Sequence, residues 1–110
     1  MSYMGIDIGQ TGTKALVFDN KGNQIAYSYR EYETLFPREG WAELDSKRVI
    51  ESCFEVIKEA NTACKNNPVK AVAISSQGEA FTPVDKDGNI LYNAMITSDI
   101  RSSTVLKICT

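Results

Sequence analysis

The residues best suited to chemistry lie in one short segment near the N-terminus, Asp-Ile-Gly-Gln-Thr-Gly-Thr-Lys at 7–14, between two apolar runs. This arrangement predicts a turn between two strands, and consecutive backbone N–H groups in such a turn form a concave donor site for phosphate oxygens. Gly9 and Gly12 allow backbone angles and close approaches that a Cβ atom would block. Lys14 adds a positive charge, and the Asp7 carboxylate can hold a divalent cation through water. The segment therefore predicts a site for the phosphates of a nucleotide.

A Gly-x-x-Gly sequence between two strands is by itself only a hairpin signal. Its spacing matches neither G-x-x-x-x-G-K-[ST] nor G-x-G-x-x-G, and no helix is expected directly after the turn. What favours a phosphate site is the presence of an Asp, two Gly, two Thr and a Lys, because a plain hairpin needs neither the Asp nor the Lys. The predicted phosphate-binding residues are Gly9, Gln10, Thr11, Gly12, Thr13 and Lys14, and the predicted metal ligand is Asp7.

Four motifs, in order, resemble those of the FGGY carbohydrate kinases, which belong to the actin-like, ribonuclease H-like ATPases. The first is the segment just described, with the Asn-Lys-Gly turn at 20–22 after it. The second, Gly-Trp-Ala-Glu-Leu-Asp at 40–45, is similar to the family's Gly-Trp-x-Glu-x-Asp. The third, at 71–79, is similar to the strand and loop that carry sugar contacts. The fourth, at 93–102, resembles the run Pro-Ala-Ile-x-Trp-x-Asp-x-Arg, so the ordered set covers residues 4–102.

This resemblance implies ATP-dependent phosphorylation of a sugar or polyol hydroxyl, with Asp7 near Mg²⁺ and the turn residues facing the ATP phosphates. The expected contacts of the sugar or polyol are with Gln77, Gly78, Glu79 and Asp99. In the family, the base that takes the acceptor proton lies beyond the position of Thr110. No catalytic residue is therefore assigned in this chain, which by itself is expected to be inactive.

Several positions depart from the patterns of the family's subgroups. Gln10 stands where many members have Thr, although its amide still donates hydrogen bonds. Gly78 and Glu79 do not match the Gln-Met-His of xylulokinases, and Gly78 replaces the Arg of the Gln-Arg-Glu found in glycerol kinases. Thr97 replaces the aromatic residue usual four positions before Arg101, which removes a platform for sugar stacking. The sequence therefore leaves the identity of the sugar or polyol open.

Two other functions remain open. The chain could be a non-catalytic actin-like module that uses the same hairpin for nucleotide-dependent assembly or sensing, or a small α/β scaffold without a ligand. Structural interpretations also compete at single residues. Asp99 and Arg101 can form a structural pair, Glu79 can be a solvated charge, and Trp41 can cover a helix end. The tyrosines at 27, 29 and 32 are expected to lie on a sheet face.

The composition is that of one ordinary soluble domain, with 110 residues, 43% hydrophobic residues and a net charge of −2. The pI near 5.1 argues against nucleic acid or an anionic membrane as a partner. No apolar run approaches the ~20 residues of a membrane span, and the first residues do not resemble a signal peptide. We therefore expect a cytoplasmic protein whose partners are ATP and a small sugar or polyol; a homo-oligomer is not excluded.

The cysteines and histidines limit the chemistry further. The chain has three cysteines, at 53, 64 and 109, with no C-x-x-C motif and no histidine. We expect buried, reduced thiols instead of a disulfide framework or a zinc site. Ser–His and Cys–His nucleophilic catalysis are excluded within this chain because no histidine is present.

The elements expected to position the phosphate turn are strands at 3–9 and 13–19, followed by a third strand at 24–33. A helix is predicted at 46–66 because its apolar residues recur at three- and four-residue spacings, and Asp45 is its expected N-cap.

A short buried strand is predicted at 69–74, parallel to the first sheet because a crossover helix precedes it. A final hairpin is expected to pair 80–84 with 89–92. The order β-β-β-α-β plus a C-terminal β-hairpin predicts an α/β fold with a mixed β-sheet, in agreement with the ribonuclease H-like (actin-like ATPase) core. Residues 1–110 are expected to form a partial domain, the N-terminal part of the FGGY kinase N-terminal domain.

Overall fold

The structure is a computed structural model that describes residues 1–103 and 105, and the chain forms two compact units. The first unit contains Met1–Tyr32 and Arg48–Gln77. The second unit contains Glu33–Lys47 and Gly78–Thr110.

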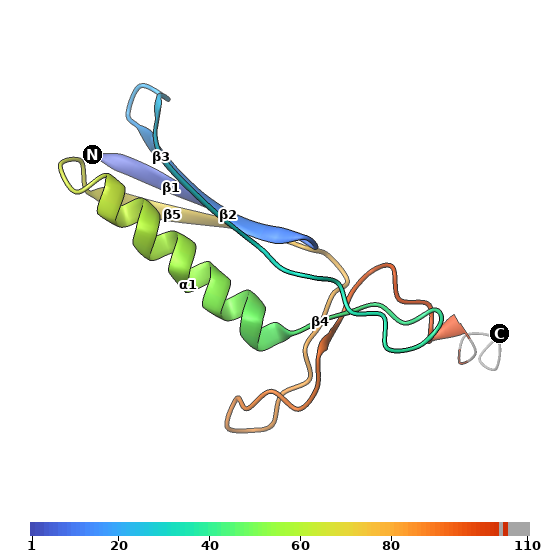
Figure 1. Cartoon of the computed structure of the whole chain (residues 1–110). Coiled ribbons are helices and arrows are strands. Elements are labelled where there is room, and N and C mark those ends of the chain that lie inside the picture. The colour runs from blue at the N-terminus through green and yellow to red at the C-terminus, as the bar shows by residue number, and fades with distance from the viewer. Residues whose placement is uncertain (104, 106–110) are drawn as a thin grey trace. The chain divides into compact units, whose positions relative to one another are not determined.

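The first unit is built on a four-stranded mixed sheet with the order β3-β2-β1-β5 (Figure 1). Its strands are β1 (Ser2–Ile8), β2 (Gly12–Asp19), β3 (Gln24–Glu31) and β5 (Val69–Ser76). β1 pairs antiparallel with β2, and β2 pairs antiparallel with β3. β5 returns to pair parallel with β1 after the crossover. The predicted parallel pairing of the strand after the helix is confirmed, and with it the α/β class with a mixed sheet.

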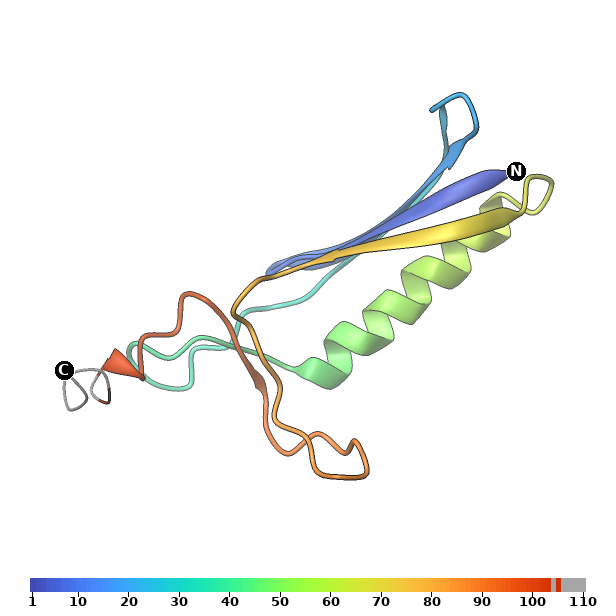
Figure 2. The ribbon, with the colours of Figure 1, turned by 180° about the vertical axis from the view of Figure 1, so that it is seen from behind.

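The helix α1 (Ser46–Ala63) lies along one face of this sheet, as Figures 1 and 2 show from opposite sides. Alternate residues of β1 and β2 point towards the helix, because successive side chains of a strand face opposite sides. They meet the apolar stripe of the helix in a core of Met4, Ile6, Ala15, Val17, Ala26, Val56, Ala60 and Cys64. The helix ends three residues earlier than predicted. Asp45 acts as its N-cap, since its Oδ1 accepts a bond from the Lys47 N–H at 3.1 Å.

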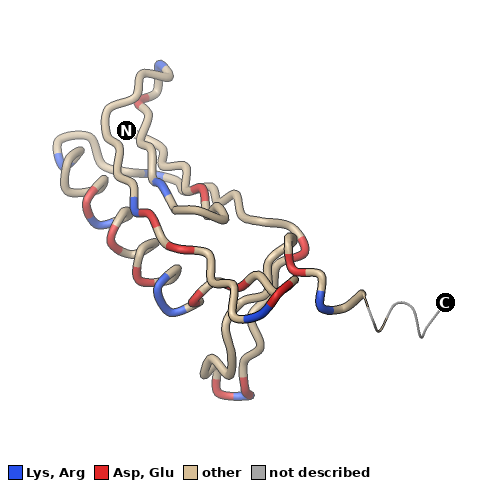
Figure 3. Tube along the Cα trace, turned by 45° about the vertical axis from the view of Figure 1, so that its right-hand side comes forward, with Lys and Arg blue, Asp and Glu red and all other residues tan. Residues whose placement is uncertain are grey.

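The outer side of α1 is solvated and carries charges of both signs, which follow one another along the helix in Figure 3. Arg30 of β3 reaches this side of the helix. Its guanidinium contacts Glu55 at 3.1 Å and Glu59 at 2.5 Å. These exposed ion pairs link β3 to α1 but contribute little to stability.

β5 differs from the prediction of a buried strand. Val72 and Ile74 are 54% and 66% exposed. They pair with Met4 and Ile6, which are buried. The reason is position: β5 is the edge strand of the described sheet, and the core beneath α1 takes its buried strand residues from β1, β2 and β3, with Val69 of β5 only partly buried against it.

The second unit contains a small antiparallel sheet of β4 (Glu43–Leu44) and β6 (Ala94–Met95), which the sequence did not predict. The predicted pairing of 80–84 with 89–92 is wrong in extent. The end near the turn is paired, since Val84 bridges Ile90 and the Leu91 N–H donates to the Pro83 carbonyl at 2.9 Å, but Phe81 pairs with Met95 instead. Pro83 explains the difference, because proline has no N–H to donate to a ladder.

The two turns that share the pattern Asp-x-x-Gly-Asn adopt the same structure. In one, Gly22 donates to the Asp19 carbonyl at 3.1 Å, and in the other Gly88 donates to the Asp85 carbonyl at 3.0 Å. Both glycines have positive φ, 87° and 83°, which glycine adopts without steric cost. The predicted repeat of turn chemistry is confirmed.

Cys64 is buried as predicted, whereas Cys53 is only partly buried, and both are free thiols. Cys109 lies outside the described residues. None of the helices in the described part of the chain is both long and apolar enough to cross a membrane.

Candidate functional site

The predicted phosphate turn connects β1 to β2, and the last residues paired before it are Ile8 and Thr13. Gly9 donates its N–H to the Gly12 carbonyl at 2.9 Å, which closes the turn. Within residues 1–103, the N–H groups of Gln10 and Thr11 donate no hydrogen bond. Two backbone donors at the tip of the turn are therefore available to a ligand.

Gly9 and Gly12 do not adopt an unusual backbone angle, because neither has a positive φ. Their role is to allow close packing. Gly12 is buried against β3, and a Cβ atom added there would lie 2.7 Å from the Arg30 carbonyl oxygen and would overlap the Tyr29 ring. A Cβ atom at Gly9 would lie 3.1 Å from the Gly12 carbonyl oxygen. Both positions therefore favour glycine on steric grounds.

Tyr32 holds the turn from the side of β3. Its hydroxyl donates to the Gly9 carbonyl, and its backbone N–H donates to the Thr11 carbonyl at 3.1 Å. Burial raises the pKa of Tyr32 to about 12, so the hydroxyl stays protonated and able to donate. The sequence analysis missed this role. The available signal was a tyrosine placed directly after the strand that pairs with the turn.

Asp7 and Lys14 face each other across the β1–β2 pair, with 3.8 Å between the Asp7 carboxylate and the Lys14 Nζ. Both side chains are about half exposed, at 49% and 44%. The side chain of Thr13 has a different place, because its buried hydroxyl donates to the Asp7 carbonyl at 3.0 Å and lies 3.7 Å from the Cys53 sulfur. Any contact of Thr13 with a phosphate would have to come from its backbone.

Among the described residues there is no group of three or more His, Cys, Asp or Glu side chains that could hold a metal ion. Asp7, the predicted metal ligand, would offer one carboxylate from this chain. That donor set suits Mg²⁺, which is usually bound by one or two carboxylates together with substrate phosphates and water.

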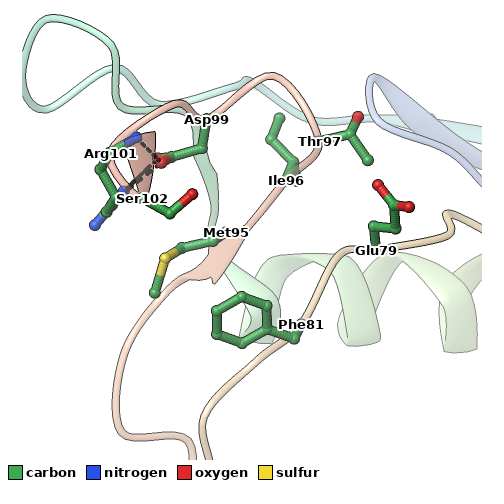
Figure 4. Close-up of a pocket in the computed structure, with 8 residues that line it drawn as sticks. All are labelled: Glu79, Phe81, Met95, Ile96, Thr97, Asp99, Arg101 and Ser102. Carbon is green, nitrogen blue, oxygen red and sulfur yellow. Dashed lines mark hydrogen bonds and ion pairs between the residues drawn. The ribbon is translucent and has the colours of Figure 1, made fainter. Parts of the chain in front are cut away.

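The second unit contains a pocket of about 250 Å³ between the segments 79–81 and 95–102 (Figure 4). Two of the predicted sugar-binding residues, Glu79 and Asp99, line this pocket. Gln77 and Gly78 do not line it. Among the described residues, those that line the pocket are Glu79, Phe81, Met95, Ile96, Thr97, Asp99, Arg101 and Ser102.

Glu79 has a φ of 61°, in the left-handed region that non-glycine residues rarely adopt. Such a backbone costs about 1–3 kcal/mol and is found most often at binding sites and active sites. Figure 4 shows Glu79 and Thr97 close together at one end of the pocket, with Asp99 and Arg101 at the other. In the described part of the chain, the Glu79 carboxylate has no hydrogen-bond or ion-pair partner, so it is free to accept bonds from a ligand.

Arg101 is held between two buried carboxylates. It donates to Glu43 at 2.5 Å and to Asp99 at 2.6 Å, with side-chain exposures of 19% for Arg101, 0% for Glu43 and 5% for Asp99. The bonds from Arg101 hold the pKa of Asp99 well below its usual range. Burial opposes ionisation of Glu43, but bonds from Arg101 and Asn93 outweigh it and lower the pKa of Glu43. All three groups are therefore charged at neutral pH.

Asp99 is a structural residue as well as a pocket residue, because it also accepts the Ala42 N–H at 2.7 Å. Trp41 was expected to cover a helix end. In the described residues, its ring lies against two guanidinium groups. Arg101 lies 3.8 Å from the ring centroid and Arg38 lies 5.0 Å from it. Glu43 and Trp41 come from the second motif, and Asp99 and Arg101 come from the fourth, so these two motifs form one cluster.

Comparison with known proteins places this geometry in a family. The model of the FGGY family of carbohydrate kinases, N-terminal domain, matches residues 2–110. Glycerol kinase 2 of Thermotoga maritima is 34% identical over 109 residues, which are 96% of this chain and 22% of that protein. The chain thus spans about a fifth of the length of the curated relatives it matches.

Solved structures give the same result for the fold. The xylulose kinase of Rhodospirillum rubrum superposes with a TM-score of 0.88 at 23% identity, over 100% of this chain and 24% of that one. The gluconate kinase of Lactobacillus acidophilus superposes with a TM-score of 0.91 at 23% identity, over 98% of this chain and 22% of that one.

Proposed function

Because the chain belongs to the FGGY family of carbohydrate kinases and matches its N-terminal domain, we propose that the intact protein transfers a phosphoryl group from ATP to a hydroxyl of a sugar or polyol. This chain would supply the site for the ATP phosphates and part of the site for the acceptor. The observation that carries the proposal is the β1–β2 turn, where two unpaired backbone N–H groups lie beside a half-exposed Asp7–Lys14 pair.

Phosphoryl transfer depends mainly on holding the phosphates and neutralising their charge. The N–H groups of Gln10 and Thr11 would donate to phosphate oxygens, and Lys14 would add a positive charge. The ion pair of Lys14 with Asp7 is exposed and worth about 0–1 kcal/mol, so Lys14 can leave it for a phosphate at little cost. Asp7 would hold Mg²⁺, which supplies neutralising charge when bound.

The acceptor would bind in the pocket of the second unit, with Glu79 accepting bonds from its hydroxyl groups. Gln77 and Gly78 lead into this residue, and Gln77 can both donate and accept. Asp99 would form a wall of the pocket while its carboxylate holds Arg101. No residue of the described chain is proposed as the base for the acceptor proton, so we expect this chain alone to be inactive.

Lys14→Ala tests the phosphate site. In the intact protein, we expect the variant to bind Mg-ATP about 10–100-fold more weakly, which corresponds to the loss of one charged hydrogen bond. Lys21→Ala is the matched control, because Lys21 is an exposed lysine in the turn between β2 and β3. Isothermal titration calorimetry of both variants with Mg-ATP measures the effect.

Undiminished affinity of Lys14→Ala and of Asp7→Ala would contradict the assignment of the turn. ADP release by the intact protein, measured with a panel of sugars and polyols, tests the reaction itself. Normal binding of Mg-ATP with no acceptor that stimulates turnover would favour a non-catalytic nucleotide-binding module.

A further inference from the structure

We infer that the hydroxyl group of Tyr29 is a further hydrogen-bond donor of the site for the nucleotide phosphates. Tyr29 lies in β3, outside the four motifs, and its pattern predicts only a place on a sheet face. This inference rests on the proposed function, because it adds a residue to the phosphate site of the same kinase. The site would then extend from the turn onto the strand beside it.

The strand register puts Tyr29 in line with Asp7 and Lys14. Asp7 pairs with Lys14 across β1 and β2, and Lys14 pairs with Tyr29 across β2 and β3, strands that lie side by side in Figure 1. Directly opposite residues of antiparallel strands have their side chains on the same face of the sheet. The carboxylate, the ammonium group and the phenol therefore form one row across three strands.

This row lies on the face of the sheet away from α1. The residues one position along each strand, Ile6, Ala15 and Ser28, are buried, and the first two belong to the core beneath the helix. Since successive side chains of a strand point to opposite faces, the row points away from that core. Tyr29 is 38% exposed there, so a ligand bound beside the row can reach its side chain.

Packing against Gly12 brings the Tyr29 hydroxyl to the turn. A Cβ atom added at Gly12 would lie 2.6 Å from Cζ of the Tyr29 ring, and the hydroxyl oxygen would be closer still. The phenol therefore lies over the first residue of β2, which directly follows Gln10 and Thr11. The N–H groups of these two residues are the backbone donors proposed for the phosphates. The Tyr29 hydroxyl is thus a side-chain donor beside them.

The Tyr29 hydroxyl is available to a ligand, unlike the two hydroxyl groups buried at the turn. Among the described residues, Tyr29 takes part in hydrogen bonds through its backbone alone. The hydroxyl groups of Thr13 and Tyr32 instead donate to the backbone carbonyls of Asp7 and Gly9. A phenol can donate to a phosphate oxygen, and a hydrogen bond to an ionised acceptor is about twice as strong as one between neutral groups.

Tyr29→Phe tests this role, because it removes the hydroxyl group and keeps the ring that packs on Gly12. In the intact protein, we expect the variant to bind Mg-ATP about tenfold more weakly, as for the loss of one hydrogen bond to a charged group, with an unchanged midpoint of thermal denaturation. Tyr27→Phe is the matched control. Tyr27 lies on the same face of β3, farther from the turn, where it pairs with Leu16 and is 52% exposed. Isothermal titration calorimetry measures both variants.

Adenosine separates a contact with the phosphates from a contact with the nucleoside, because it carries no phosphate. Its affinity is measured by competition with Mg-ATP. We expect Tyr29→Phe to bind adenosine as tightly as the original protein does. A loss of affinity for adenosine as large as the loss for Mg-ATP would overturn this inference, since the hydroxyl group would then act on the nucleoside or on the fold.

The phosphate turn itself is tested separately by Lys14→Ala and Asp7→Ala. If these variants bind Mg-ATP weakly and Tyr29→Phe binds it as tightly as Tyr27→Phe, this inference is overturned and the proposed function stays intact. If Lys14→Ala and Asp7→Ala also bind Mg-ATP with full affinity, the assignment of the turn is overturned, and this inference with it.

Discussion

At the scale of single residues, the candidate turn and the candidate pocket each contain exposed charged groups that would face a ligand, and the turn also has buried groups that hold its backbone. Asp7 and Lys14 are half exposed at the phosphate turn, and Glu79 is exposed at the pocket. Thr13 and Tyr32 are buried, and their hydroxyl groups donate hydrogen bonds to backbone carbonyls. These bonds hold the turn in one shape, and under the proposed function this would reduce the ordering cost of binding a nucleotide.

Tyr32→Phe tests this holding role. The variant leaves the Gly9 carbonyl without its hydroxyl donor, so we expect a loss of about 1 kcal/mol in the free energy of unfolding and weaker binding of Mg-ATP. Tyr27→Phe is the control, because Tyr27 is 52% exposed. Urea denaturation and calorimetric titration with Mg-ATP measure both effects, and equal behaviour of the two variants would contradict the role given to Tyr32.

At the scale of elements, β2 begins at Gly12, where the backbone lies so close to β3 that no side chain fits between the two strands. Gly12→Ala places a methyl group against Tyr29 and the Arg30 carbonyl, so we expect a loss of about 1–3 kcal/mol in the free energy of unfolding. Gly5→Ala is the matched control in the neighbouring strand, because a Cβ atom at Gly5 meets nothing within 4 Å. Thermal denaturation compares the two, and a Gly12→Ala protein as stable as Gly5→Ala would show that the strands can separate freely.

The long elements could be predicted from the sequence because their signals are local. The apolar spacing of α1, the Asp45 cap and the Gly22 turn each act within a few residues. The pair β4 and β6 could not be predicted in this way, because two-residue strands carry no periodicity and exist only through pairing with a distant segment. The exposure of Ile74 depends in the same way on which strand lies at the edge of the sheet.

The residues of the candidate sites also divide into those with a local sequence signal and those that depend on a distant segment. The turn between β1 and β2 could be predicted because its signal lies in one short run of residues, and its role in binding phosphates stays a prediction. The cluster of Glu43, Asp99 and Arg101 could be only half predicted, since the pair Asp-x-Arg is local but its partner Glu43 comes from the other motif. A charged residue between Ala42 and Leu44 was the available signal of a buried ion pair.

At the scale of the whole molecule, the two units depend on different interactions. The first unit has a core of apolar side chains between α1 and the sheet. The second unit has the buried charges of Glu43, Asp99 and Arg101 among its central contacts. Removing one partner from such a cluster is costly, because it leaves a buried charge uncompensated. The second unit should therefore respond to pH more strongly than the first.

The pH dependence follows from the direction of the pKa shifts. The pKa of Asp99 is lowered in the folded chain relative to its ordinary value of 3.8, so the unfolded chain binds protons more readily. The contribution of Asp99 to stability is complete above that value and is lost as the pH falls below it. Glu43, with an ordinary value of 4.5 and a lowered pKa, acts in the same direction. We therefore expect the second unit to lose stability on acidification below about pH 4.

Trp41 provides the measurement, because it is the sole tryptophan of the 110-residue chain and it stacks on Arg101. Its fluorescence during urea denaturation, repeated between pH 3 and pH 7, should give a midpoint that is constant near neutrality and falls in acid. In Arg101→Gln the two carboxylates lose their donor and repel each other, so the pKa of at least one should rise. The midpoint of this variant should then be lower at pH 7 and should rise on mild acidification, as the first proton relieves the repulsion. A variant whose midpoint follows the original pH profile would mean that the cluster does not stabilise the second unit.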